Sequence, residues 1–78
     1  MEKYKTIDDL LSVQCLEIRE DEDVYIFKPP LINPFDMSAY VVKKDTEQIA
    51  YTLWFSSLAE HPNSTIVTKE EIIKRRAK

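Results

Sequence analysis

The chain has 78 residues, of which 44% are hydrophobic, and a formal net charge of −3 at pH 7. A chain of this length builds one small core and buries only about 60% of its unfolded surface, so we expect a single domain over residues 1–78. The sequence has one cysteine and no glycine, which excludes an internal disulfide and every glycine-rich phosphate-binding loop.

The same composition bears on compartment, metals and turns. No apolar run approaches the roughly 20 residues of a membrane span, and the first residues lack the apolar segment of a signal peptide. We therefore expect a cytoplasmic protein with no membrane segment. One histidine and one cysteine are too few ligands for structural zinc, so we expect no metal and no cofactor. Without glycine, hairpins need longer loops built on type I turns, or Asp or Asn in the left-handed conformation.

The first part of the chain predicts a helix and two strands. Thr6 with Asp9 is a helix-capping pair, so a short helix should begin there. Alternation over residues 13–20 predicts a strand with Leu16 and Ile18 on one side. The next apolar run, Val24–Lys28, has no polar residue before its end and should be covered on both faces until two prolines stop it.

The middle of the chain predicts an irregular crossover over residues 31–36, with a turn at Asn33-Pro34, and then a hairpin. Residues 39–44 and 48–54 should form this hairpin at the centre of the sheet, with Tyr51 and Leu53 buried. Trp54 falls on the opposite side, where a helix or a partner should cover it.

The last part predicts short elements and one well-marked helix. Ser57 and Glu60 suit a single helical turn that Pro62 stops, and residues 66–67 suit a short strand or a packed segment. Thr68 with Glu71 is a capping box for a helix over residues 69–76. Together these patterns predict an α+β fold, a mostly antiparallel sheet of about four strands with short helices at both chain ends.

The sequence contains few residues of the types that usually perform catalysis. His61 is the only histidine available as a base, and it precedes a proline near a predicted helix end. Nearby serines do not make a catalytic triad, which is defined by geometry. Cys15 lies within an apolar strand, where a thiol usually fills space in the core. We therefore expect no enzyme activity.

Two features predict binding to another protein. The acidic turn Glu20, Asp21, Glu22 and Asp23 should be a solvated tip that attracts a partner with a basic surface. Three aromatic residues are candidate anchors, because interfaces are enriched in such side chains. They are Phe35, Trp54 and Phe55, and we take the first two with the acidic turn as the predicted partner-binding set.

The segment from Tyr40 to Ile49 resembles a hairpin of small bacterial immunity proteins of polymorphic toxin systems. In that family a strand ends in a turn rich in lysine or aspartate, followed by Thr or Ser, Gly, Glu and an aliphatic residue. Glu47 stands in this chain where the family commonly has glycine. The short N-terminal helix before the sheet is similar too. The resemblance implies a protein that acts by binding, and it assigns no functional residue.

We therefore expect a non-catalytic protein that binds a protein partner, as immunity proteins and phage-encoded inhibitors do. One alternative is a small nucleic-acid-binding or transcription-related module that uses the basic C-terminal helix. Two glutamates reduce the positive charge of that helix, and the chain as a whole is acidic. Both features disfavour phosphate binding. A second alternative is a structural homodimer subunit that pairs strand edges.

Overall fold

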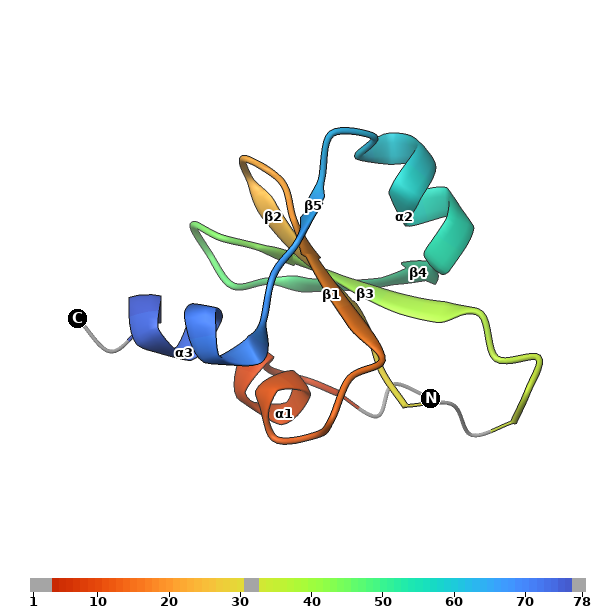
Figure 1. Cartoon of the computed structure of the whole chain (residues 1–78), viewed down its shortest axis with the longest axis horizontal. Coiled ribbons are helices and arrows are strands. Elements are labelled where there is room, and N and C mark those ends of the chain that lie inside the picture. Colours follow the sequence, from red (N-terminus) through yellow and green to blue (C-terminus); the bar gives the residue numbers. More distant parts are fainter. Residues whose placement is uncertain (1–3, 31–32, 77–78) are drawn as a thin grey trace.

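The computed structural model describes residues 4–30 and 33–76, which form a five-stranded antiparallel sheet and three helices (Figure 1). The predicted α+β class is confirmed. The sheet has five strands instead of about four, because a short strand near the predicted residues 66–67 joins it, and a seven-residue helix stands where a single helical turn was expected. In chain order the elements are α1 (Ile7–Leu11), β1 (Glu17–Glu20), β2 (Val24–Lys28), β3 (Ser38–Lys43), β4 (Ile49–Leu53), α2 (Trp54–Glu60), β5 (Thr65–Ile66) and α3 (Lys69–Arg76).

The strand order is β4-β3-β2-β1-β5, so β2 is the middle strand and β4 lies at an edge. The prediction that the β3–β4 hairpin forms the sheet centre is therefore wrong. Tyr51 and Leu53, which we expected to be buried, are 54% and 53% exposed. Alternation along β4 shows which residues share a face of the sheet, but it does not show whether anything covers that face.

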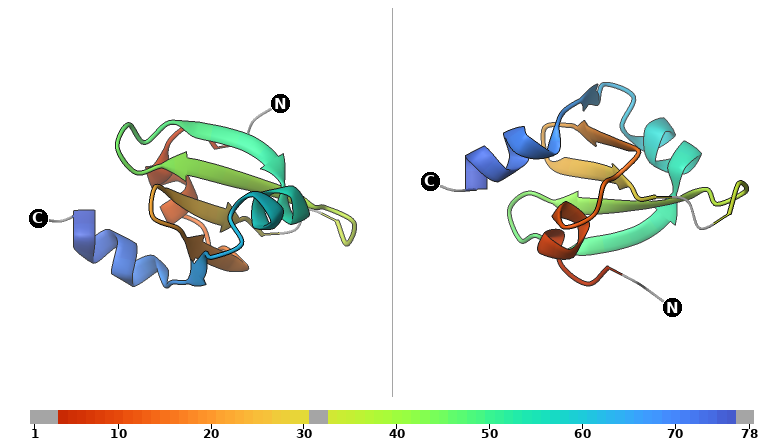
Figure 2. Two further views of the ribbon diagram at one scale, coloured as in Figure 1. Left: turned by 90° about the horizontal axis from the view of Figure 1, so that it is seen from above. Right: turned by 60° about the horizontal axis from the view of Figure 1, so that its bottom comes forward.

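β2 is covered on both faces, as its apolar run predicted. Tyr25 and Phe27 face the side of the sheet that α1 and α3 cover, while Val24 and Ile26 face α2. The three helices are therefore divided between the two sides of the sheet (Figures 1 and 2). Lys28 ends the strand before the two prolines, as expected.

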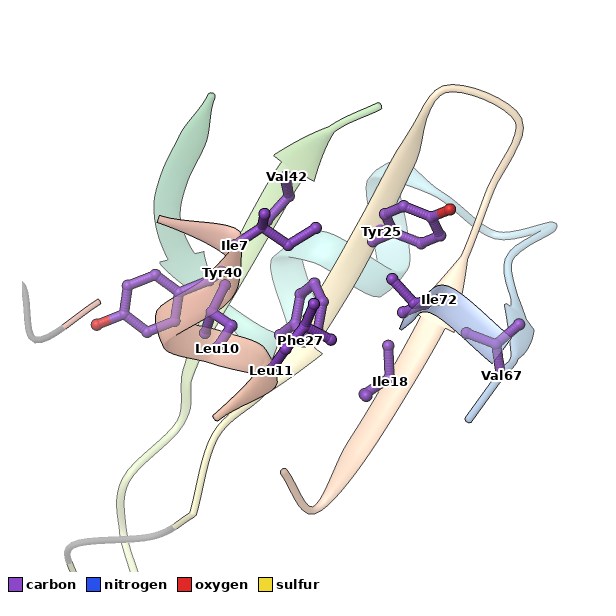
Figure 3. Packing of buried hydrophobic residues seen from close by; sticks show 10 residues of the cluster. All are labelled: Ile7, Leu10, Leu11, Ile18, Tyr25, Phe27, Tyr40, Val42, Val67 and Ile72. Atoms are coloured by element: carbon purple, nitrogen blue, oxygen red, sulfur yellow. The ribbon is translucent and has the colours of Figure 1, made fainter. Parts of the chain in front are cut away.

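The larger core lies between the sheet and the two terminal helices (Figure 3). Leu10 and Leu11 of α1 point onto Phe27, and Ile72 of α3 lies between Tyr25 and Ile18. Burying side chains of this size contributes about 1.5–3 kcal/mol each. The cluster comprises Ile7, Leu10, Leu11, Ile18, Tyr25, Phe27, Tyr40, Val42, Val67 and Ile72.

The smaller core lies under α2 and contains Trp54. This side chain is 8% exposed and packs with Val24, Ile26 and Ala39. The helix begins at Trp54 itself, so the prediction of a single turn capped by Ser57 is wrong. Ser57 is buried in mid-helix, where its Oγ donates to the Trp54 carbonyl over 2.6 Å. Burial of the indole against the sheet sets where this helix starts, and local capping chemistry does not.

The β3–β4 turn shows how the chain bends without glycine. The Glu47 N–H donates to the Lys43 carbonyl over 2.8 Å, and the Lys43 N–H donates to the Gln48 carbonyl over 3.0 Å. Glu47 has φ of 60°, the one positive φ among the described residues. The expectation of a longer loop is confirmed. The residue that adopts the left-handed conformation is a glutamate, however, and not the expected Asp or Asn.

Local capping signals located the terminal helices correctly. Thr6 and Asp9 form a reciprocal capping box at the start of α1. Thr68 and Glu71 form another at the start of α3, whose bounds match the prediction. The first strand is shorter than expected, because it begins at Glu17 and leaves Leu16 exposed.

Candidate functional site

The acidic turn between β1 and β2 is not the isolated charged tip that the sequence suggested. The Glu20 carboxylate accepts from the Lys44 ammonium over 2.7 Å and from the Arg75 guanidinium. The Asp21 carboxylate lies 3.0 Å from Nδ1 of His61. The expectation of a solvated tip is therefore wrong for Glu20, since folding brings Arg75 of α3 onto its carboxylate.

These contacts shift the carboxyl groups toward the charged form. The hydrogen bond from Arg75, with a further contribution from Lys44, lowers the pKa of Glu20. The pKa of Asp21 is lowered by the backbone N–H of Glu22 and by His61. Both acids are thus engaged within the chain. Glu22 and Asp23 are exposed and can still attract a basic surface.

The basic C-terminal helix is also engaged within the chain. Arg76 contacts Glu47 through Nε over 3.0 Å and Asp8 through Nη1 over 2.8 Å. With Arg75 on Glu20, both arginines of α3 have carboxylate partners. A phosphate backbone would have to displace these carboxylates, which further disfavours the nucleic-acid alternative.

Of the two predicted aromatic anchors, only Phe35 is exposed. Trp54 belongs to the core under α2, where the Lys28 ammonium lies 5.6 Å from the ring centroid. Phe35 is 86% exposed. It lies on the loop that leads into the start of β3 and projects from the sheet (Figure 2). Residues 31 and 32 of the predicted crossover lie outside the described residues.

Phe35 is held on a hydrogen-bonded turn over residues 33–36, here called the Phe35 turn. The Phe35 N–H donates to Oδ1 of Asn33 over 2.9 Å, and the Asp36 N–H donates to the Asn33 carbonyl over 3.1 Å. Oδ1 of Asp36 in turn accepts from the Ser38 N–H over 3.0 Å. The predicted turn at Asn33-Pro34 is confirmed, and its bonds hold the backbone beneath the exposed ring.

More apolar residues gather at the same end of the sheet. The Trp54 N–H donates to the Met37 carbonyl over 2.7 Å, which brings the start of α2 beside the Phe35 turn. Phe55, in the first turn of that helix, is 66% exposed. Leu53 precedes it on β4. Phe55 was noticed as a candidate in the sequence, whereas Leu53 was missed because its alternation with Tyr51 looked like a core pattern.

The structure places the acidic turn and the Phe35 turn at opposite ends of the sheet. Val24, next to the acids, pairs with Lys43 at the far end of β3, whereas the Phe35 turn leads into Ser38 at the near end. The predicted partner-binding residues therefore do not form one surface. The apolar end combines exposed aromatic side chains with a hydrogen-bonded turn.

The other reactive side chains have structural surroundings. Burial raises the pKa of Cys15 to about 11, and its Sγ donates to the Leu10 carbonyl. Such a thiol is a poor nucleophile at neutral pH. The His61 imidazole pairs with the Asp21 carboxylate, and the hydrogen bonds of His61 to Ser57 and Ser64 join backbone groups. In residues 4–30 and 33–76, no group of three acidic, histidine or cysteine side chains is arranged to hold a metal ion. No helix in these ranges is long and apolar enough to cross a membrane.

Comparison with known proteins gives no family for this chain. No protein-family model matches it, and no curated protein or solved structure is significantly similar to it. The functional argument therefore depends on the site itself.

Proposed function

We propose that this chain is a non-catalytic protein of the inhibitor or immunity type that binds a partner protein through the Phe35 turn and Phe55. The observation that carries the proposal is Phe35, which is 86% exposed on a turn fixed by side-chain hydrogen bonds. A buried phenylalanine gains about 1.5–3 kcal/mol over an exposed one. A partner that covers this ring recovers that free energy.

The rigidity of the turn favours binding over chance exposure. A loop already held in one conformation loses little entropy when a partner orders it. The bonds at Asn33 and Asp36 fix the backbone on both sides of Phe35. Phe55 extends the apolar surface from the first turn of α2. Aromatic side chains are enriched at protein interfaces, which suits this pair to anchor a complex.

The turn at Glu47 supports the immunity-type assignment. The positive φ falls at the position where the resembled family commonly has glycine, so the backbone of this hairpin is compatible with the family's turn. At the other end of the molecule, Glu22 and Asp23 are placed to speed the approach of a partner with a basic surface.

The test is capture of the partner by the tagged chain in its native host, with identification by mass spectrometry. We expect wild type to retain a protein that Phe35→Ser loses, since the serine removes the ring from an exposed position and should leave the fold intact. Leu16→Ser is the matched control, because Leu16 is also an exposed apolar side chain but lies on the β1 side of the sheet. Equal recovery of the same proteins by wild type and Phe35→Ser would overturn the proposal.

A further inference from the structure

The two edges of the sheet differ in length and chemistry. β5 forms one edge and has two residues, whereas β4 forms the other with five. The sequence of β4 is Ile-Ala-Tyr-Thr-Leu, without charge or proline. Proteins usually protect an edge strand with charges, prolines, bulges or short length. β5 is protected by its length, while β4 has none of these devices.

The backbone of β4 presents a regular set of outward groups. The Lys43 N–H donates to the Gln48 carbonyl, and the Trp54 N–H donates to the Met37 carbonyl. In an antiparallel ladder hydrogen-bonded pairs alternate with non-bonded pairs, so Ala50 and Thr52 also bond to β3. Ile49, Tyr51 and Leu53 consequently direct their N–H groups away from β3. Within the described ranges no strand pairs with that side of β4.

We propose that two copies of this chain associate by antiparallel pairing of their β4 strands about a two-fold axis at Tyr51. Tyr51 of each copy then exchanges two backbone hydrogen bonds with Tyr51 of the other. Ile49 lies opposite Leu53 of the second copy. The two sheets join into one, and α1 and α3 of both copies stay on the same side of it. The proposal does not depend on the function proposed above.

Three observations favour a second copy over a different protein as the occupant. β4 is uncharged, and β4 of a second copy is an uncharged strand of the same length that can pair along all of it. Tyr4, Tyr40 and Tyr51 form a series of edge-to-face contacts, with ring centroids 5.3 and 5.4 Å apart, that ends at this edge. The second Tyr51 continues the series across the axis. Pairing also covers the half-exposed Tyr51 and Leu53 side chains.

The symmetry gives a specific test by sedimentation velocity. The wild-type chain of 9.2 kDa should reach twice its monomer mass as its concentration rises. Tyr51→Lys and Tyr51→Glu should each remain monomeric, because each places like charges opposite one another across the axis. An equimolar mixture of the two variants should recover the doubled mass as a heterodimer. Phe35→Ser should dimerise like wild type, which separates this result from the partner test.

A cross-linking test covers the case in which the charged variants do not fold. In a Cys15→Ser background, Tyr51→Cys should form an intermolecular disulfide under mild oxidation. Thr52→Cys is the matched control, since position 52 lies opposite Ala50 of the second copy and should cross-link far less. The proposal is overturned if wild type is monomeric at every concentration, if its dimer survives both charged variants, or if the two cysteine variants cross-link equally.

Discussion

Replacing Glu20 with glutamine should destabilise the protein, even though the residue belongs to an acidic cluster that looks self-repelling in the sequence. The Glu20 side chain is 18% exposed and holds Lys44 of the β3–β4 turn and Arg75 of α3. Hydrogen bonds to charged groups contribute about 1.5–3 kcal/mol. Arg75 is nearly half exposed, so solvent screens its share. We therefore expect a loss of about 1–2 kcal/mol from the two contacts together.

Urea unfolding followed by the fluorescence of Trp54, the only tryptophan, measures this loss. For a domain of this size each kcal/mol corresponds to about 4–8 °C in Tm. Glu22→Gln is the matched control, because Glu22 is exposed and no cation from residues 4–30 or 33–76 pairs with its carboxylate. It should change stability by less than about 0.5 kcal/mol. Equal shifts for the two variants would refute the argument that Glu20 joins three elements.

The acid limb of the stability curve gives an independent check. Because the pKa of Glu20 is lowered in the folded state, its contribution is fully present above the unfolded-state value of about 4.3. That contribution is lost as the pH falls through the lowered folded-state pKa. The stability difference between wild type and Glu20→Gln should therefore shrink toward acid pH. A difference that stays constant from neutral to acid pH contradicts the ion-pair explanation.

Three further experiments test other parts of the structure. Leu53→Ala should cost less than about 1 kcal/mol in urea unfolding, whereas Leu10→Ala in the core should cost about 2–5 kcal/mol. Thr68→Ala should cost about 0.5–2 kcal/mol and speed amide exchange in the first turn of α3, through loss of its cap. Glu47→Gly removes the steric cost of a left-handed backbone at a residue with a side chain, but it also removes the ion pair with Arg76. It should stabilise an Arg76→Ala background by up to about 1 kcal/mol and the wild type by less, which a double-mutant cycle resolves.

The parts of the fold that follow from neighbouring residues could be predicted from the sequence. Thr6 and Thr68 each begin a helix through a partner three residues away, and both helix starts are correct. The uninterrupted apolar run of β2 correctly indicated a strand covered on both sides. These signals are local, so a single sequence carries them.

The errors concern features set by residues far apart in the chain. Arg75 and Glu20 lie 55 positions apart, and no spacing pattern announces that they meet. The hairpin richest in aromatics was expected at the sheet centre, but the return of β5 onto β1 leaves β4 at the edge. Contacts between distant residues also explain why the candidate site was only partly predicted. Phe35 was recognised from its residue type. The exposure of Leu53 depends on how far α1 and α3 extend over their face of the sheet, and the burial of Trp54 depends on where α2 packs on the other face.

The return of β5 onto β1 also affects the order of folding. β1 meets β2 through a short turn, but it meets β5 only when residue 66 comes back to residue 19. Closing that longer loop costs more chain entropy, so we expect β5 and α3 to dock late onto a meander that has already formed. Contacts absent from the transition state affect mainly the rate of unfolding. Ile72→Ala should then speed unfolding while leaving the folding rate nearly unchanged, and the docking of α3 would set how long the native molecule resists proteases.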